Sequence, residues 1–197
     1  MKDSHVAVDV TRAAVELFAT RGYANTSVQQ IVEAAGVTKG AMYHYFESKD
    51  DLLFGIYDDL LSLQKTHLDD IIGRGGDVDD VLRAVCVDVL ETSIDNIQAG
   101  AVFFRSMHML SEPRQQEVTR RRRAYNDAFA ALIERGQSEG VYRTDIPTAV
   151  LLAHFFSDLH YLSHWYSPEG PESKTVVAEQ ITDLFLTSLR RPDAVHD

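Results

Sequence analysis

Three groups of residues in this sequence have types and spacings that suit binding chemistry. His160 and His164 stand four residues apart, the helical spacing at which two imidazoles can hold one metal ion. Residues 120–123 are four consecutive arginines, which suit an anion. Residues 26–46, TSVQQIVEAAGVTKGAMYHYF, gather hydroxyl groups, a lysine, a histidine and tyrosines around a glycine, and such side chains contact nucleic acid.

The first two groups have plainer structural explanations. No cysteine or glutamate ligand motif accompanies His160 and His164, and histidines near a subunit interface often bond each other or water. We therefore predict no metal and no cofactor. Four consecutive arginines fan around a helix axis, as on a solvated face, although an anionic ligand such as an acyl thioester of coenzyme A is an alternative. No phosphate-cradling loop, nucleophile elbow or HExxH motif occurs, so we predict no enzyme activity.

Composition indicates a globular chain in a reducing compartment. The 197 residues are 45% hydrophobic, enough for a core, and the single cysteine, Cys86, excludes an internal disulfide and is expected to be buried. We find no signal peptide and no apolar run long enough for a membrane span, so we predict a cytoplasmic protein without a membrane partner. The net charge of −11 argues against nucleic acid unless local features outweigh it.

The elements that carry these residues are all expected to be helices, because apolar residues recur at intervals of three and four residues. The first ends near Gly22. Thr26 and Gln29 read as a capping box for a short helix closed by Gly36, and Thr38 caps another through Tyr45. Ser48 and Asp51 begin a longer helix. Further helices are expected at 78–97, 101–110, 114–139, 148–166 and 174–190, with loops that include 98–100 and 111–113.

Two short helices joined at Gly36 have the proportions of a helix-turn-helix, whose second helix enters the major groove. The run AGVTKG at 35–40 with YHYF at 43–46 resembles the DNA-binding signature of the tetracycline-repressor (TetR) family. Residues 17–23 and 48–52 resemble the flanking helices of that family. The resemblance implies an all-α fold, with a three-helix DNA-binding domain at 1–50 and a helical ligand-binding and dimerisation domain at 51–197.

The resemblance and the side-chain chemistry together predict the DNA contacts. The exposed amides beside Thr38 suit a phosphate. Met42, Tyr45 and Phe46 are expected to pack, and the residues expected to face outward are Lys39, Gly40, Tyr43 and His44. The candidate DNA-binding residues are Thr26, Ser27, Thr38, Lys39, Gly40, Ala41, Tyr43, His44 and Lys49. Residues 1–50 hold five basic and six acidic groups, a net charge of −1, and Lys2 and Arg12 are the only cations of the N-terminal arm.

The second domain is expected to bind a small molecule and a second copy of the chain. The candidate ligand-binding residues are Phe103, Phe104, Met107, Tyr125, Asp158, Tyr161 and Trp165, although such aromatic and methionine stripes are often simply core. Residues 164–170 also resemble the corresponding segment of actinobacterial regulators of sterol and fatty-acid breakdown. Apolar stripes on the last two helices predict a homodimer.

The sequence thus predicts a ligand-responsive repressor that binds palindromic operator DNA. A small hydrophobic or acyl-CoA-like effector is expected to release it, by tilting the helix that begins at Ser48. The alternative is an all-helical dimeric interaction module whose DNA binding is weak or lost, a hypothesis favoured by the acidic charge and the weakly basic arm.

Overall fold

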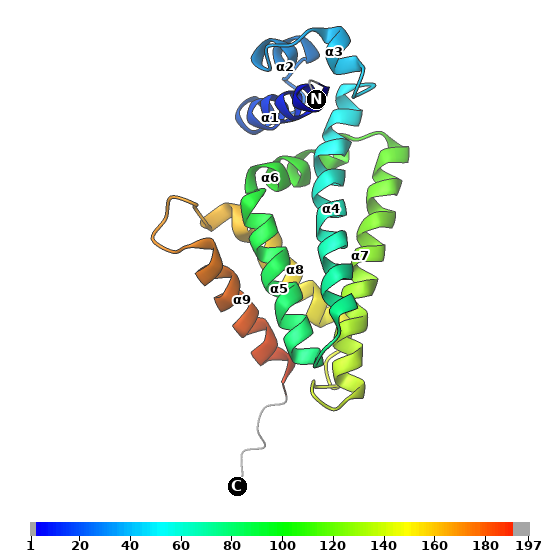
Figure 1. Cartoon of the computed structure of the whole chain (residues 1–197), viewed down its shortest axis with the longest axis vertical. Coiled ribbons are helices and arrows are strands. Elements are labelled where there is room, and N and C mark those ends of the chain that lie inside the picture. The colour runs from blue at the N-terminus through cyan, green and yellow to red at the C-terminus, as the bar shows by residue number, and fades with distance from the viewer. Residues whose placement is uncertain (1–2, 191–197) are drawn as a thin grey trace. The chain divides into compact units, whose positions relative to one another are not determined.

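A computed structural model describes residues 3–190, and the chain is helical throughout that range apart from turns and loops (Figure 1). The predicted all-α class is confirmed. The elements are α1 (Asp3–Arg21), α2 (Val28–Ala34), α3 (Lys39–Tyr43), α4 (Lys49–Arg74), α5 (Val78–Asp95), α6 (Ile97–Ser106), the 3-10 helix η1 (Met107–Met109), α7 (Glu112–Ser138), α8 (Thr148–Trp165) and α9 (Lys174–Leu189).

Two compact units divide the chain, and each is described by itself. The first comprises Met1–Leu61 and Asn96–Arg120, and the second comprises Ser62–Asp95 and Arg121–Asp197. Both α4 and α7 therefore contribute residues to each unit. The predicted boundary at residue 50 stays a prediction.

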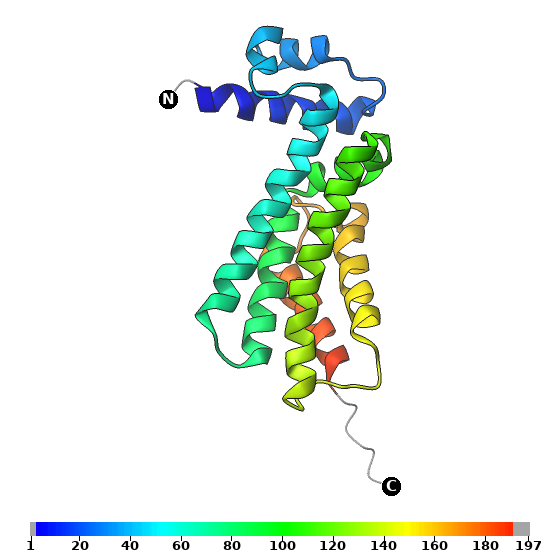
Figure 2. The ribbon, with the colours of Figure 1, turned by 90° about the vertical axis from the view of Figure 1, so that its right-hand side faces the viewer.

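In the first unit, α1 packs on α2, α3 and α6, and Figure 2 shows it lying beneath α2 and α3. Phe18 and Ala14 of α1 are buried together with Ile31 of α2 and Met42 of α3. The short helices contribute few apolar residues of their own. Their fold therefore depends on burying this shared core, since helices of five to seven residues are unstable in isolation.

Polar contacts within the same unit join the start of α4 to the start of α7. The carboxylate of Asp50 accepts hydrogen bonds from the Ser111 backbone N–H (3.0 Å) and hydroxyl (2.8 Å). Arg114 pairs with Asp51, and its guanidinium lies 4.3 Å from the centroid of the Phe54 ring. A carboxylate of one helix thus caps the next, where unsatisfied backbone donors favour negative charge.

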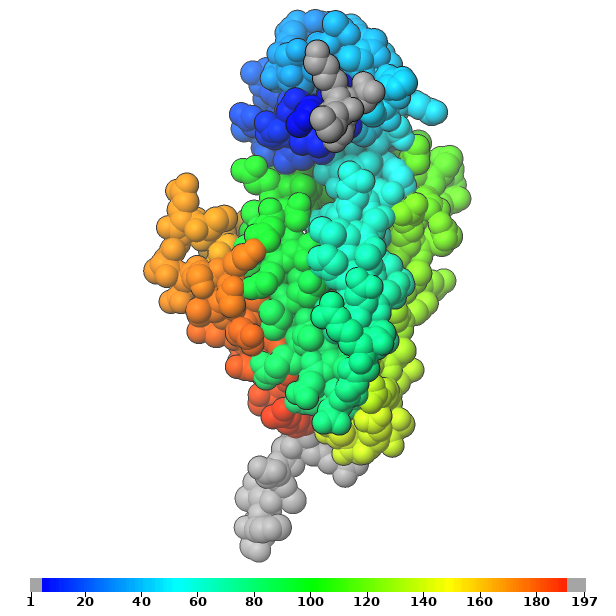
Figure 3. Space-filling view, viewed as in Figure 1, coloured from blue at the N-terminus to red at the C-terminus, as the bar shows by residue number. Residues whose placement is uncertain are grey.

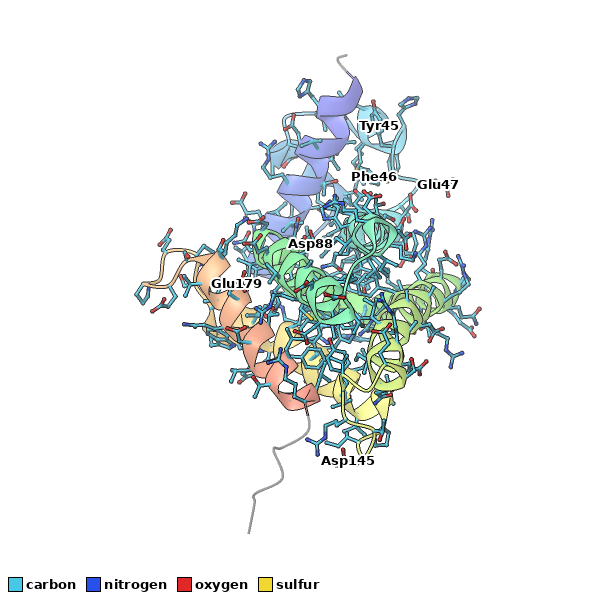
Figure 4. The ribbon with its side chains drawn as sticks, turned by 60° about the horizontal axis from the view of Figure 1, so that its bottom comes forward. Tyr45, Phe46, Glu47, Asp88, Asp145 and Glu179 are labelled. Atoms are coloured by element: carbon cyan, nitrogen blue, oxygen red, sulfur yellow. The ribbon has the colours of Figure 1, made fainter. Side chains whose placement is uncertain are left out.

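The second unit is held by the packing of α9 along α5, which Figure 3 shows as orange and red beside green. Buried Phe185 and Val177 of α9 contribute to its core. At the edges, Arg83 pairs with Glu179 (3.2 Å) and Asp183 (2.6 Å), and Glu179 is labelled in Figure 4. One side of α9 therefore packs against α5 of the same chain.

Aromatic side chains join α7 to α8 in this unit. The Phe129 ring centroid lies 5.2 Å from that of Phe155 and 5.4 Å from that of Phe156, and Phe155 also meets Phe185 at 4.7 Å. Tyr125 stands 6.2 Å from Phe156. Such tilted pairs stabilise a core beyond the area they bury. Cys86 is buried as predicted, and burial raises the pKa of its thiol.

Two predicted loops were wrong. Residues 98–100 lie inside α6, because only Asn96 interrupts the chain there and the Gly100 N–H donates to its carbonyl at 3.0 Å. Residues 112 and 113 begin α7, since a proline in a first helical turn loses no backbone hydrogen bond. The segment predicted as helix 101–110 ends earlier, at Ser106, and continues as η1.

Candidate nucleic-acid interface

The N-terminus of α2 is capped one residue later than predicted. The Ser27 hydroxyl oxygen accepts from the Gln30 N–H at 3.2 Å, and the Gln30 side chain accepts from the Ser27 N–H at 2.8 Å. Thr26 is only 1% exposed, and its hydroxyl donates to the Gly22 carbonyl at 2.9 Å. The Thr26–Gln29 capping box was wrong, because burial directs Thr26 into the preceding turn and leaves the next residue to cap.

The turn between α2 and α3 depends on Gly36, as the sequence predicted. Its φ of +67° is strained for a residue with a Cβ. The Gly36 N–H donates to the Glu33 carbonyl at 3.2 Å, and the Val37 N–H donates to the Val32 carbonyl at 2.9 Å. These two bonds form a Schellman motif, which ends α2 and reverses the chain within three residues.

The second short helix, α3, has one anchored side and one exposed side. The Thr38 hydroxyl caps it by accepting from the Ala41 N–H at 3.1 Å, as predicted, although the helix ends at Tyr43 rather than Tyr45. Met42 is fully buried. Four exposed residues form what we call the reading face: Lys39, Gly40, Tyr43 and His44. Tyr43 is 49% exposed, so a large aromatic side chain here stands outside the core.

The connection to α4 packs its aromatic residues, as predicted. Tyr45 and Phe46, labelled with Glu47 in Figure 4, are partly buried. The Ser48 hydroxyl accepts from the Asp51 N–H at 3.0 Å, and the Asp51 carboxylate accepts from the Glu47 N–H at 3.1 Å. The Ser48 hydroxyl therefore caps α4 as expected. In a capping box the Asp51 carboxylate would accept from the Ser48 N–H, but here it accepts from the Glu47 N–H.

Two of the candidate DNA-binding residues are engaged inside the protein. Thr26 is buried, as described above, and the Lys49 ammonium donates to the backbone carbonyls of Tyr23 and Thr26. Nothing in their spacing foretold these contacts, because the partners of Lys49 lie 23 and 26 residues away. Ser27 is exposed but its hydroxyl caps α2, and Ala41 is half-buried.

Few cations are available at this end of the chain. Arg12 pairs with Asp9 at 2.9 Å, whereas Arg21 and Lys39 are exposed. Lys2, the other predicted cation of the arm, lies outside the described residues. The positive charge that α3 can present therefore comes mainly from Lys39.

The candidate ligand-binding residues fall into a buried group and an exposed group. In the first unit, Phe103 stacks on Tyr57 with centroids 3.7 Å apart, and Phe104 meets both edge-on, while Met107 is half-buried in η1. In the second unit, Tyr125 is buried between α7 and α8. The exposed members all lie on α8: Asp158, Tyr161 and Trp165.

The histidines of α8 also separate. His160 is half-buried, and burial, with a smaller contribution from Arg122, lowers its pKa to about 4. His164 is exposed and stacks on Tyr161 at 4.5 Å. Across residues 3–190 no group of three or more possible metal ligands occurs, and no helix in that range has the length and apolarity that a bilayer span requires.

Comparison with known proteins places these features in a family. The family of tetracyclin repressor-like C-terminal domains matches residues 75–189, and the tetR family of bacterial regulatory proteins matches residues 10–56. The HTH-type transcriptional repressor KstR2 of Rhodococcus jostii (strain RHA1) is 29% identical over 185 residues, which cover 91% of this chain and 88% of KstR2.

Solved structures agree with this relationship. PfmR, a TetR family transcriptional regulator from Thermus thermophilus, matches with a TM-score of 0.83 and 26% identity, covering 92% of this chain and 99% of that chain. AibR, solved in complex with isovaleryl coenzyme A and operator DNA, matches with a TM-score of 0.74 and 21% identity, covering 95% of this chain and 99% of that chain.

Proposed function

Because the chain belongs to the TetR family of bacterial regulatory proteins and is a transcriptional repressor rather than an enzyme, we propose how it reads and releases DNA. Two copies bind a palindromic operator, each through the reading face of α3. A small hydrophobic or acyl-CoA-like effector bound elsewhere in the chain weakens that binding.

The observation that carries the proposal is the division of α3 between an anchor and an exposed face. Met42 is fully buried, which fixes the rotation of α3 about its own axis. Lys39, Tyr43 and His44 remain exposed on the other side. A helix entering the major groove needs this arrangement, since base edges are read by side chains whose backbone is fixed. Gly40 lets the backbone of α3 approach the DNA closely, because it has no Cβ.

The charge of the DNA-binding end predicts specific binding with few phosphate contacts. Residues 1–50 carry a net charge of −1, and Lys49 is engaged internally. Each neutralised phosphate contributes about −0.9 to the slope of log affinity against log salt. We therefore expect a shallow salt dependence, in which base contacts by Tyr43 and His44 carry a large share of the affinity.

Exposed apolar residues of α8 and α9 support a homodimer. Val150, Tyr161 and Trp165 of α8 are 56%, 59% and 55% exposed, and Leu184 of α9 is 72% exposed. The opposite side of α9 is already packed on α5. A second copy of the chain would cover these residues and present two reading faces to operator half-sites about 34 to 36 Å apart.

The effector class is supported by aromatic side chains and by a structural neighbour. Tyr57, Phe103 and Phe104 in the first unit, and Tyr125 and Phe156 in the second, are the residue types that line hydrophobic ligand sites. AibR is described with isovaleryl coenzyme A and operator DNA. The arginines of α7 add positive charge suited to the phosphates of coenzyme A.

The test is a mobility-shift titration with a duplex that the wild-type protein selects from a randomised pool. Tyr43→Ala and Lys39→Ala are expected to weaken binding about tenfold or more, since each removes a contact of the reading face. Lys65→Ala is the matched control, because Lys65 pairs with Asp69 on α4 and lies outside the reading face. Unfolding curves must show that all three variants are folded.

Two outcomes would contradict the proposal. If both reading-face variants bind as wild type at matched salt, α3 is not the reader. If the wild-type dimer selects no duplex, the alternative of an interaction module without DNA binding is favoured, as the net charge of −11 suggested.

A further inference from the structure

The ammonium group of Lys49 is held by the backbone between α1 and α2. It donates to the Tyr23 carbonyl at 2.9 Å and to the Thr26 carbonyl at 2.8 Å. It also lies 4.3 Å from the centroid of the Tyr23 ring, a cation–π contact. Burial lowers the pKa of the lysine, so its charge is partly withdrawn from water.

The carbonyls that Lys49 binds lie in a turn with few other ways to satisfy them. Gly22 has a φ of +83° and ends α1, so the following carbonyls leave the helical hydrogen-bond pattern. The Tyr23 carbonyl accepts one further bond, from the Thr26 N–H at 3.3 Å. Phe18 holds the Tyr23 ring edge-on at 5.1 Å. The turn therefore presents two acceptors and a ring face to one cation.

From this geometry we propose that Lys49 is a positioning residue, which fixes the helix-turn-helix without touching DNA. Thr26 immediately precedes Ser27, the cap of α2, and Lys49 is the first residue of α4. The bond from Lys49 to the Thr26 carbonyl, which we call the tether, thus joins the residue before the α2 cap to the first residue of α4. It links the two ends of the segment that contains α2, α3 and the reading face.

This assignment rests on the proposed reading of DNA by α3, and it removes Lys49 from the candidate DNA-binding residues. An ammonium has three donors, and two of those on Lys49 are used by buried or half-buried backbone. Moving it to a phosphate would leave the Thr26 carbonyl unsatisfied, which is unfavourable for a residue 1% exposed. Lys39, which is exposed, is the natural comparison.

The first experiment measures amide hydrogen exchange of the free, full-length protein and needs no DNA. Lys49→Met keeps the length of the side chain and removes its charge and donors. It is expected to speed exchange in residues 22–31 at least severalfold, because the turn before α2 loses its tether. Lys39→Met, the matched control, should leave exchange in this segment unchanged. Unchanged exchange in Lys49→Met would overturn the assignment.

The second experiment measures operator affinity of the same variants at several salt concentrations. Lys49→Met should lower affinity roughly tenfold, the scale of a lost charge-assisted hydrogen bond, while keeping the wild-type salt slope. Lys39→Met should lower affinity and reduce the slope by about 0.9, as the loss of one phosphate contact requires. Lys49→Arg, which retains charge and donors, should recover part of the affinity.

The outcomes separate the tether from the proposed function. A slope reduced by about 0.9 in Lys49→Met would make Lys49 a phosphate contact and overturn the positioning role. Failure of the wild-type protein to select any duplex would contradict DNA reading, yet hydrogen exchange would still decide whether Lys49 holds the turn.

Discussion

Gly136 stands where α7 ends and the chain folds back upon it. The Gly136 carbonyl accepts from the Val141 N–H at 2.8 Å and the Tyr142 N–H at 3.1 Å, and Gly140 has a φ of +77°. This reversal lays the Tyr142 ring, which is 1% exposed, across the glycine. A Cβ added to Gly136 would lie 2.1 Å from Cδ2 and 2.3 Å from Cε2 of that ring.

Two opposing effects decide what Gly136→Ala does to stability. Alanine is favoured over glycine in a helix by about 1 kcal/mol. The new methyl group, however, needs more than 1 Å of extra room from a ring whose position is fixed near the backbone, and overpacking a core costs about 1 to 3 kcal/mol or more. Because the overlap with the ring is severe, the upper end of that cost, about 3 kcal/mol, applies. The net destabilisation is then about 2 kcal/mol, which lowers the melting temperature by roughly 4 to 8 °C for a chain of this size.

Thermal unfolding followed by circular dichroism at one protein concentration measures this effect. Gly100→Ala in α6 is the control, because nothing lies within 4 Å of its added Cβ, and it should raise stability slightly. In a Tyr142→Ala background, Gly136→Ala should become neutral or stabilising, since the ring is gone. A Gly136→Ala protein that melts at or above the wild-type temperature would refute the reasoning.

Two further predictions concern charged groups. Burial, then Arg122, lowers the pKa of His160 to about 4, below its ordinary value near 6.5. As pH falls, His160 therefore takes up a proton in the unfolded chain before it does so in the folded chain. The free energy of unfolding is expected to fall between about pH 6.5 and 4 for this reason. His160→Phe should flatten that dependence in denaturant titrations. In the same assay, Arg114→Met should lower the free energy of unfolding by about 1 kcal/mol, because the half-buried Asp51 carboxylate loses its ion pair. Arg120→Met should change it little, because Arg120 is exposed. A steeper pH dependence in the histidine variant, or equal losses for both arginines, would contradict these predictions.

Local features of the fold could be predicted from the sequence. Helical periodicity and the glycines indicated the order of the long helices, and Gly36 adopts the positive φ expected of it. The outward direction of Lys39 and Tyr43 followed from the apolar residues between them. Each of these depends on neighbours within a few positions, which is the range that a sequence pattern describes.

The capping-box error arose because two local patterns were equally good, and contacts between residues far apart in the sequence lay outside any local pattern. Thr26–Gln29 and Ser27–Gln30 both fit a capping box, and only the burial of Thr26 against α1 decides between them. Lys49 was predicted to contact DNA from its position alone, whereas the fold brings its ammonium to two backbone carbonyls. Asp50 likewise caps α7 from 61 residues away. No spacing rule contains such contacts, because the whole chain must fold to create them.

The internal engagement of Lys49 also bears on how an acidic protein can recognise DNA. A reading face whose one lysine is Lys39 has little general attraction for phosphates, and the net charge of −11 opposes approach. In the proposed dimer, two linked reading faces would compensate, since binding of the first would hold the second at a high effective concentration near its half-site. Weak non-specific binding then becomes an advantage. The ratio of specific to non-specific affinity decides occupancy in a genome, so a repressor with few phosphate contacts loses less of its population to random DNA.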